Sequence, residues 1–157
     1  MSKAESYSAE EWQEIVSAPL LAGMLVITSD PAIFGSIKES ATIAKTINEL
    51  GQTSEIELIR EIGMAMSGKN KPQMPEVPTK QGPEAVMKAL VKECHAAALI
   101  VQSRSPEEAD AFSAYLIEVA KKTAESSKEG GFLGIGATRV SDKEKAAVKQ
   151  LADALGV

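Results

Sequence analysis

The sequence has few of the residues that carry most protein chemistry. It holds one cysteine, one histidine and one tryptophan in 157 residues, and aromatic side chains make up only 4% of it. A single cysteine excludes a disulfide within the chain and is compatible with a reducing compartment. One cysteine and one histidine are too few for the ligand set of a structural zinc site. The scarcity of aromatics favours a core of Ala, Leu, Ile, Val and Met, as in a helix bundle, over a β-sandwich.

The chain also lacks an excess of basic residues and a long hydrophobic run. Its formal net charge of −5 argues against a nucleic-acid partner, which needs a basic face. The N-terminal stretch is polar and acidic, unlike a secretory signal. The longest apolar runs are about half of the ~20 residues that a membrane span requires. We therefore expect a cytoplasmic protein of one domain, without a membrane span, a cofactor or a metal site.

Helix signals occur along the whole chain, and no segment alternates with a period of two residues over a useful length. Five Ser–Glu pairs have the spacing of a capping box, in which each side chain satisfies a backbone N–H at the helix start. They are Ser8/Glu11, Ser36/Glu39, Ser54/Glu57, Ser105/Glu108 and Ser141/Glu144. Pro19 lies inside the first helical pattern and predicts a kink or break near Ala18. The sequence therefore predicts an all-α bundle of about six helices.

The stretch Pro83–Gln102 is predicted to be the central helix of this bundle. Its second half, from Ala96 to Val101, is apolar at every position. A helix that is hydrophobic all round is buried, with other helices covering each of its faces. We therefore expect Leu99 to be buried.

A stretch rich in proline and glycine, residues 68–82, divides the chain into two halves, 8–67 and 83–157. Each half has an apolar helix that ends in a Ser–Pro-type turn, then an amphipathic helix, then a shorter capped helix. This order predicts two similar three-helix halves and an ancestral duplication. We expect residues 68–82 to be an extended surface crossover, and a partner-binding or lid segment is the alternative.

A glycine-rich stretch that ends at Arg139 has two partial matches to nucleotide-binding motifs. Gly131 and Gly136 have the spacing of a phosphate-binding loop, but Ala137 stands where that motif needs lysine. Gly134 and Gly136 could begin a dinucleotide fingerprint, but Arg139 stands where the third glycine belongs. Neither match follows a predicted strand, so we reject both interpretations.

Two interpretations of the same stretch remain. The favoured one is a connection between helices, with Phe132, Leu133 and Ile135 inserted into the core. The alternative is an anion site made of backbone amides, a guanidinium and a helix N-terminus. Its residues would be Gly134, Gly136, Arg139 and Ser141.

The remaining chemistry-bearing residues favour structural roles. Cys94 and His95 are neighbours on a predicted helix and point about 100° apart, so they cannot pair as nucleophile and base. We expect a buried or half-buried, structural His95. Methionines are expected to fill the core, with an adaptable apolar pocket as the alternative; they are Met24, Met64, Met66, Met74 and Met87. No catalytic residues can be assembled from motif spacing, so we do not expect an enzyme.

The order of these patterns resembles the TerB-like tellurite-resistance proteins. The similarity rests on an apolar helix, a turn at Ser29-Asp30, an amphipathic helix and the ending Arg139–Gly156. It implies a small, duplicated, all-helical module and a stress-related role. In that family the turns after the apolar helices carry an Asp-Gly pair and nearby acids that can bind a cation. Here Pro31 follows Asp30, and the matching turn carries Arg104, so the resemblance implies a fold and no metal ligands.

Taken together, these observations favour a non-enzymatic protein that acts through contact with a protein partner or a second copy of itself. The alternative is a carrier for a small apolar ligand, with an apolar pocket between the helical halves. A cavity between helices would favour the carrier, and an exposed apolar patch of several hundred Å² would favour the partner-binding protein.

Overall fold

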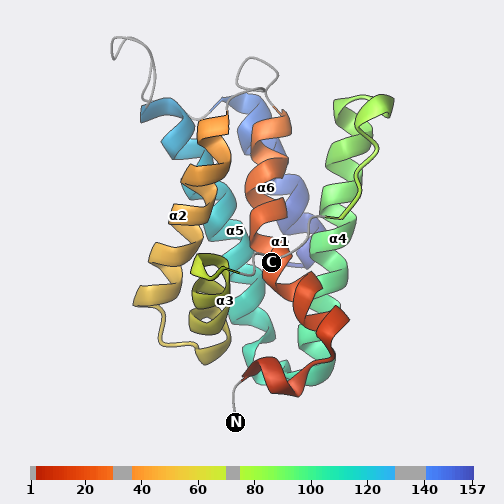
Figure 1. The fold of residues 1–157 in the computed structure, drawn as a ribbon. Coiled ribbons are helices and arrows are strands. Elements are labelled where there is room, and N and C mark those ends of the chain that lie inside the picture. The colour runs from red at the N-terminus through yellow and green to blue at the C-terminus, as the bar shows by residue number, and fades with distance from the viewer. Residues whose placement is uncertain (1–2, 30–36, 70–74, 130–140) are drawn as a thin grey trace.

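Helices make up all the regular structure of the part of the chain that is described. The computed structural model describes residues 3–29, 37–69, 75–129 and 141–157, and these residues form no strand. The six α-helices are α1 (Ala9–Ser29), α2 (Ile37–Thr53), α3 (Glu57–Ser67), α4 (Pro83–Arg104), α5 (Pro106–Glu129) and α6 (Asp142–Leu155), shown in Figure 1. Two short 3-10 helices, η1 (Lys3–Ser6) and η2 (Thr79–Gln81), precede α1 and α4. The predicted all-α bundle is confirmed.

The central helix of the bundle is α1. It contacts each of the other five α-helices and runs through the middle of the bundle in Figure 1. Its buried residues follow no single face: they are Ile15, Val16, Ser17, Ala18, Pro19, Leu21, Ala22, Gly23, Leu25, Val26, Thr28 and Ser29. This is the burial pattern of a helix that other helices cover on all sides.

The predicted central position of Pro83–Gln102 is therefore wrong. α4 buries one face only, formed by Val86, Leu90, Cys94, Ala97 and Val101. The side chain of Leu99 is 51% exposed. Leu99 falls on the same helical stripe as the exposed residues Lys88, Lys92 and His95, at spacings of three and four. This stripe lies on the exposed side of α4. The apolar run from Ala96 to Val101 covers less than two helical turns, so Leu99 stays on the exposed side although its neighbours in sequence are apolar.

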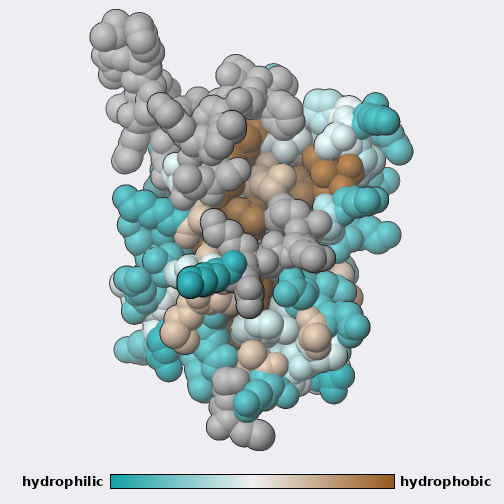
Figure 2. Space-filling model, viewed as in Figure 1, coloured by the Kyte–Doolittle hydropathy of each residue, from teal (hydrophilic) through white to brown (hydrophobic). Residues whose placement is uncertain are grey.

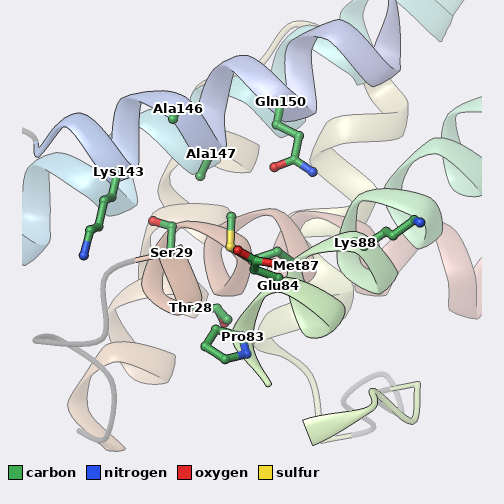
Figure 3. A pocket seen from close by; sticks show the side chains of 10 residues that line it. All are labelled: Thr28, Ser29, Pro83, Glu84, Met87, Lys88, Lys143, Ala146, Ala147 and Gln150. Atoms are coloured by element: carbon green, nitrogen blue, oxygen red, sulfur yellow. The ribbon is translucent and has the colours of Figure 1, made fainter. Parts of the chain in front are cut away.

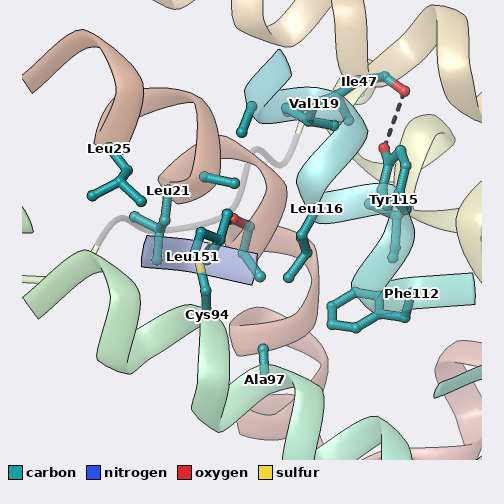
Figure 4. Close-up of a cluster of buried hydrophobic side chains, with 14 of the residues drawn as sticks. Leu21, Leu25, Ile47, Cys94, Ala97, Phe112, Tyr115, Leu116, Val119 and Leu151 are labelled. Atoms are coloured by element: carbon teal, nitrogen blue, oxygen red, sulfur yellow. Dashed lines mark hydrogen bonds between the residues drawn. The ribbon is translucent and has the colours of Figure 1, made fainter. Parts of the chain in front are cut away.

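α3 and α5 bury residues that recur at spacings of three and four. On α3 these are Ile59, Ile62 and Met66, and on α5 they are Phe112, Leu116, Val119, Ala120 and Thr123. Figure 4 shows Leu21 and Leu25 of α1 converging with Cys94 of α4, Leu116 of α5 and Leu151 of α6. In the same view the Tyr115 hydroxyl donates to the Ile47 carbonyl oxygen, 3.2 Å away, and so joins α5 to α2.

α2 and α3 cross at two glycines. A Cβ atom on Gly51 would lie 2.9 Å from the Cα of Gly63, and one on Gly63 would lie 3.0 Å from the Cα of Gly51. A side chain at either position would push the two backbones apart. The glycines therefore allow α3 to lie directly against α2.

Two of the five predicted capping boxes are confirmed. At α1 the backbone N–H of Glu11 donates to Ser8 Oγ (3.1 Å), and the Ser8 N–H donates to the Glu11 carboxylate (2.9 Å). At α6 both distances between Ser141 and Glu144 are 3.2 Å. The box at Ser36 lies outside the described residues.

The boxes predicted at Ser54 and Ser105 are wrong. α3 has Ile56 as its N-cap, and Ser54 Oγ accepts the Ile56 N–H, 3.1 Å away, in a local turn. Ser105 Oγ accepts the hydroxyl of Tyr7 (2.9 Å), and the Glu108 carboxylate reaches α3. In both places the side chains that a capping box would use form hydrogen bonds with other partners.

α1 continues through Pro19, so the interruption predicted near Ala18 does not end the helix. By length and composition α1 is apolar enough to cross a membrane, and 61% of its apolar window is buried inside the bundle. A buried core helix of a soluble protein meets the same criteria. α1 therefore does not test the predicted cytoplasmic location, which stays a prediction.

Candidate functional site

A groove lies where the last turn of α1 meets the first turns of α4 and α6. Its volume is about 640 Å³. The lining residues are Thr28 and Ser29 of α1, Pro83, Glu84, Met87 and Lys88 of α4, and Lys143, Ala146, Ala147 and Gln150 of α6. Figure 3 shows Met87 in the middle of the groove, between Gln150 on α6 and Thr28 on α1. The groove therefore lies between a helix of the first half and two helices of the second.

A smaller, apolar pocket adjoins the groove. It has a volume of about 270 Å³ and is lined by Met24, Thr28, Val77, Thr79, Gly82, Pro83 and Val86. Thr28 and Pro83 line both spaces. Figure 2 shows hydrophobic side chains gathered on the upper part of the molecule, toward the ends of α1 and α4 that border the groove. Because they share these two residues, the groove and the pocket are neighbours, and we refer to them together as the α1–α4–α6 cavity.

Local sequence signals determine where this cavity opens. Gly82 has a φ of 98°, which favours glycine, and Pro83 at the first helical position starts α4 beside the end of α1. The capping box of Ser141 starts α6 on the other side. The hydroxyls of Thr28 and Ser29 donate to the carbonyl oxygens of Met24 (2.8 Å) and Val26 (2.6 Å). Both hydroxyl donors are thus used inside α1, so these residues can border an apolar space at low cost.

The predicted crossover 68–82 contributes to the cavity. Residues 70–74 lie outside the described residues, and the rest includes η2. Val77 is half-buried and packs against the hydrophobic core. Among the methionines, Met24 and Met87 line the cavity, Met66 is buried and Met64 is 65% exposed. The pocket interpretation thus applies to two methionines and the core-filling interpretation to Met66.

Cys94 has the environment of a structural thiol. It is fully buried, and its Sγ donates to the carbonyl oxygen of Ala18, 3.5 Å away. Burial, together with the charge of Glu93, raises the pKa of the thiol to about 12, so Cys94 is protonated and unreactive near neutral pH. His95 is exposed, and the prediction that it is buried or half-buried is wrong because it falls on the outer stripe of α4.

The anion site predicted at Gly134, Gly136, Arg139 and Ser141 is placed only in part. The two glycines and Arg139 lie outside the described residues. Ser141 is the N-cap of α6, and its hydroxyl accepts the N–H of Glu144. Within the described ranges, no group of three or more His, Cys, Asp or Glu side chains has a geometry that could hold a metal ion.

Sequence reasoning missed an ionic cluster at the opposite end of the bundle, formed by Lys3, Glu61, Glu107 and Glu108. The two carboxylate oxygens of Glu61 accept the backbone N–H groups of Lys3 (2.8 Å) and Ala4 (3.0 Å). Lys3 Nζ forms ion pairs with Glu108 and, at 3.5 Å, with Glu107. These contacts hold η1 against α3 and α5. They also raise the pKa of Lys3, chiefly through Glu108.

Glu108 is the buried member of this cluster. Its Oε2 accepts the backbone N–H of Leu58 (3.2 Å) at the start of α3. Its Oε1 is buried and has the geometry of an ion pair with Lys3 Nζ, without a directed hydrogen bond. The side chain is 9% exposed, so Lys3 supplies the compensating charge for a carboxylate that water barely reaches.

Lys3→Met is expected to lower the free energy of unfolding by about 1–3 kcal/mol at pH 7. The expected loss is below the ~3–5 kcal/mol of a fully buried pair because the Lys3 side chain is 23% exposed. The matched control is Lys45→Met, which removes an exposed pair with Glu49 and should cost less than about 0.5 kcal/mol. Urea denaturation of both variants measures the difference, and equal losses would show that Lys3 does not neutralise a buried charge.

Comparison of the chain with protein-family models, with curated proteins and with solved structures finds no match. The resemblance to the TerB-like proteins therefore stays a prediction.

Proposed function

We propose that the protein is a non-enzymatic binding protein that carries a small molecule with an apolar body in the α1–α4–α6 cavity. The observation that carries the proposal is the groove between α1 of the first half and α4 and α6 of the second, with an apolar pocket beside it that shares Thr28 and Pro83. Both parts are lined largely by methyl, methylene and thioether groups. The larger part alone falls within the ~300–1,000 Å³ range of small-molecule pockets.

The methionines support this choice. Met24 and Met87 are half-buried, and both line the cavity. A thioether side chain has three rotatable bonds and a polarisable sulfur, so it adapts its shape to an apolar ligand. Cys94 is buried and protonated near neutral pH, which favours a binding role over thiol-dependent catalysis.

A protein partner or homo-oligomer stays a prediction, as does a stress-related role in the cytoplasm. The described residues include three large, exposed apolar side chains, Met64, Leu99 and Val157. They lie on α3, on α4 and at the end of the chain. Scattered apolar side chains are normal on a monomer surface, so the cavity supports ligand binding more strongly than this surface supports a partner.

We also propose that the two halves derive from a duplication, which would place the ligand between the two ancestral units. The order of the helices supports this, as do the contacts between the equivalent helices α1 and α4 and between α2 and α5. The third helices differ, since α3 lies mainly against α2 and α6 lies across α1, α4 and α5. In an experimental structure, residues 9–67 should superpose on residues 83–155 with their first two helices in the same order.

Binding of the neutral fluorescent probe N-phenyl-1-naphthylamine tests the proposed function. We expect saturable binding with increased fluorescence. Ala146→Trp places a large side chain over the groove and should weaken binding by about tenfold or more, because the probe and the indole compete for one space. The matched control is Ala114→Trp at an exposed position of α5, which should bind as the wild type does.

Thermal melting of both tryptophan variants shows whether each is folded. Absence of saturable binding by the wild type would overturn the proposed function. Equal weakening in both variants would place the probe outside the cavity.

A further inference from the structure

We propose that the ligand is a single-chain amphiphile with one negative charge, namely an aliphatic carboxylate. This inference rests on the proposed function and names the chemical class that the cavity takes. It follows from two properties of the lining, a change in polarity from one side to the other and a local charge that opposes the charge of the whole chain.

The polarity of the lining changes across the cavity. None of the described residues that line the smaller pocket is charged, and Met24, Val77 and Val86 provide apolar surface there. The charged residues Glu84, Lys88 and Lys143 line the groove, as does the amide of Gln150. Thr28 and Pro83 lie at the boundary between the two. A ligand that is apolar along its length and polar at one end fits this arrangement, because its chain reaches the smaller pocket while its head stays among hydrogen-bond donors.

The groove carries a positive formal charge in an acidic protein. Among the described residues that line the groove, two lysines, Lys88 and Lys143, stand against one acid, Glu84, so their formal charges sum to +1, whereas the chain has a net charge of −5. α4 and α6 begin at this groove and α1 ends there, so two positive helix ends oppose one negative end. In Figure 3 Lys143 and Lys88 stand at opposite ends of the groove. The head group is therefore an anion.

The formal charge of +1 also favours a ligand head group with one negative charge over one with two. A carboxylate balances the +1 of the groove, whereas a phosphate monoester carries close to two negative charges at neutral pH. The second charge would face Glu84, and the described part of the lining offers no further lysine to neutralise it. A carboxylate is thus the complementary head group.

Competition against N-phenyl-1-naphthylamine tests this inference with three ligands of equal chain length, each kept below the concentration at which it forms micelles. We expect dodecanoate to displace the probe at a concentration about tenfold lower than dodecanol, because the alcohol has the same chain and no charge. Dodecyl phosphate should bind no better than dodecanoate. The preference for dodecanoate should shrink as salt is added, since both lysines are exposed.

Charge variants identify the groups involved. Lys88→Gln and Lys143→Gln together should reduce the preference for dodecanoate to about twofold or less, and the single variants show which lysine contacts the carboxylate. The control is the pair Lys121→Gln and Lys145→Gln, which changes the net charge equally at exposed lysines beside a separate hollow between α5 and α6. This control should keep the wild-type preference. Glu84→Gln should increase it.

The outcomes separate this inference from the proposed function. Failure of the probe to bind would overturn the proposed function. Normal probe binding with equal displacement by dodecanol and dodecanoate would overturn the inference alone. Stronger binding of dodecyl phosphate would also overturn it, since the groove would then accept two negative charges. Loss of the preference in the control pair would overturn the assignment to Lys88 and Lys143.

Discussion

Leu21→Ala is expected to lower the free energy of unfolding by about 2–5 kcal/mol. The Leu21 side chain is 1% exposed and lies on α1, which contacts all five other α-helices and is buried along most of its length. Removing its terminal carbons takes apolar surface out of the core and leaves a cavity that surrounding helices cannot fully close. Urea denaturation followed by circular dichroism measures the loss.

Leu99→Ala is the matched control, because the same atoms are removed from a leucine that is 51% exposed. We expect it to cost less than about 1 kcal/mol, since alanine favours a helix and little buried contact is lost. A larger loss from Leu99→Ala than from Leu21→Ala would contradict the placement of α1 at the centre and restore α4 to that position.

The apolar stripes and the capped starts of α1 and α6 could be predicted from the sequence because they depend on neighbouring residues. The three-four spacing of Phe112, Leu116 and Val119 is enough to define the buried face of α5. The prediction that α4 is central is wrong because it rests on six consecutive apolar residues, 96–101, whereas the polar residues along the whole helix define an exposed face. Lys88, Lys92 and His95 already marked the outer face of α4, and Leu99 continues their stripe.

The ionic cluster and the cavity could not be predicted, because both depend on contacts between distant residues. The spacing of Ser105 and Glu108 fits a capping box, yet Glu108 contacts Leu58 and Lys3, which lie far away in the sequence. Similarly, Thr28 and Pro83 show no motif that would pair them, although both line the cavity. Local sequence defines the helices, and the packing of α1 against α4 creates the site.

The protein is expected to lose stability steeply between pH 9 and pH 12. Burial raises the pKa of the Cys94 thiol from 9.0 to about 12, and burial also raises the pKa of Tyr7 and of Tyr115. In this range the unfolded chain gives up protons that the folded chain keeps. The stabilisation from each group is therefore fully present below the pKa of its unfolded form and is lost as the pH rises through the folded pKa. Between its unfolded and folded pKa, such a group contributes at most about 1.4 kcal/mol per pH unit.

Cys94 should account for roughly 2–3 kcal/mol of the loss between pH 8 and pH 11, measured by urea denaturation under reducing conditions. Cys94→Ser tests this share, because a serine hydroxyl can still donate to the Ala18 carbonyl oxygen but does not titrate in this range. The variant should be less stable than the wild type at pH 8, since a hydroxyl is more polar than a thiol. Its further loss up to pH 11 should be smaller by that same amount, the remainder coming from the tyrosines and Lys3. An identical loss in both proteins would show that the thiol is already ionised, or is reached by water, in the folded state.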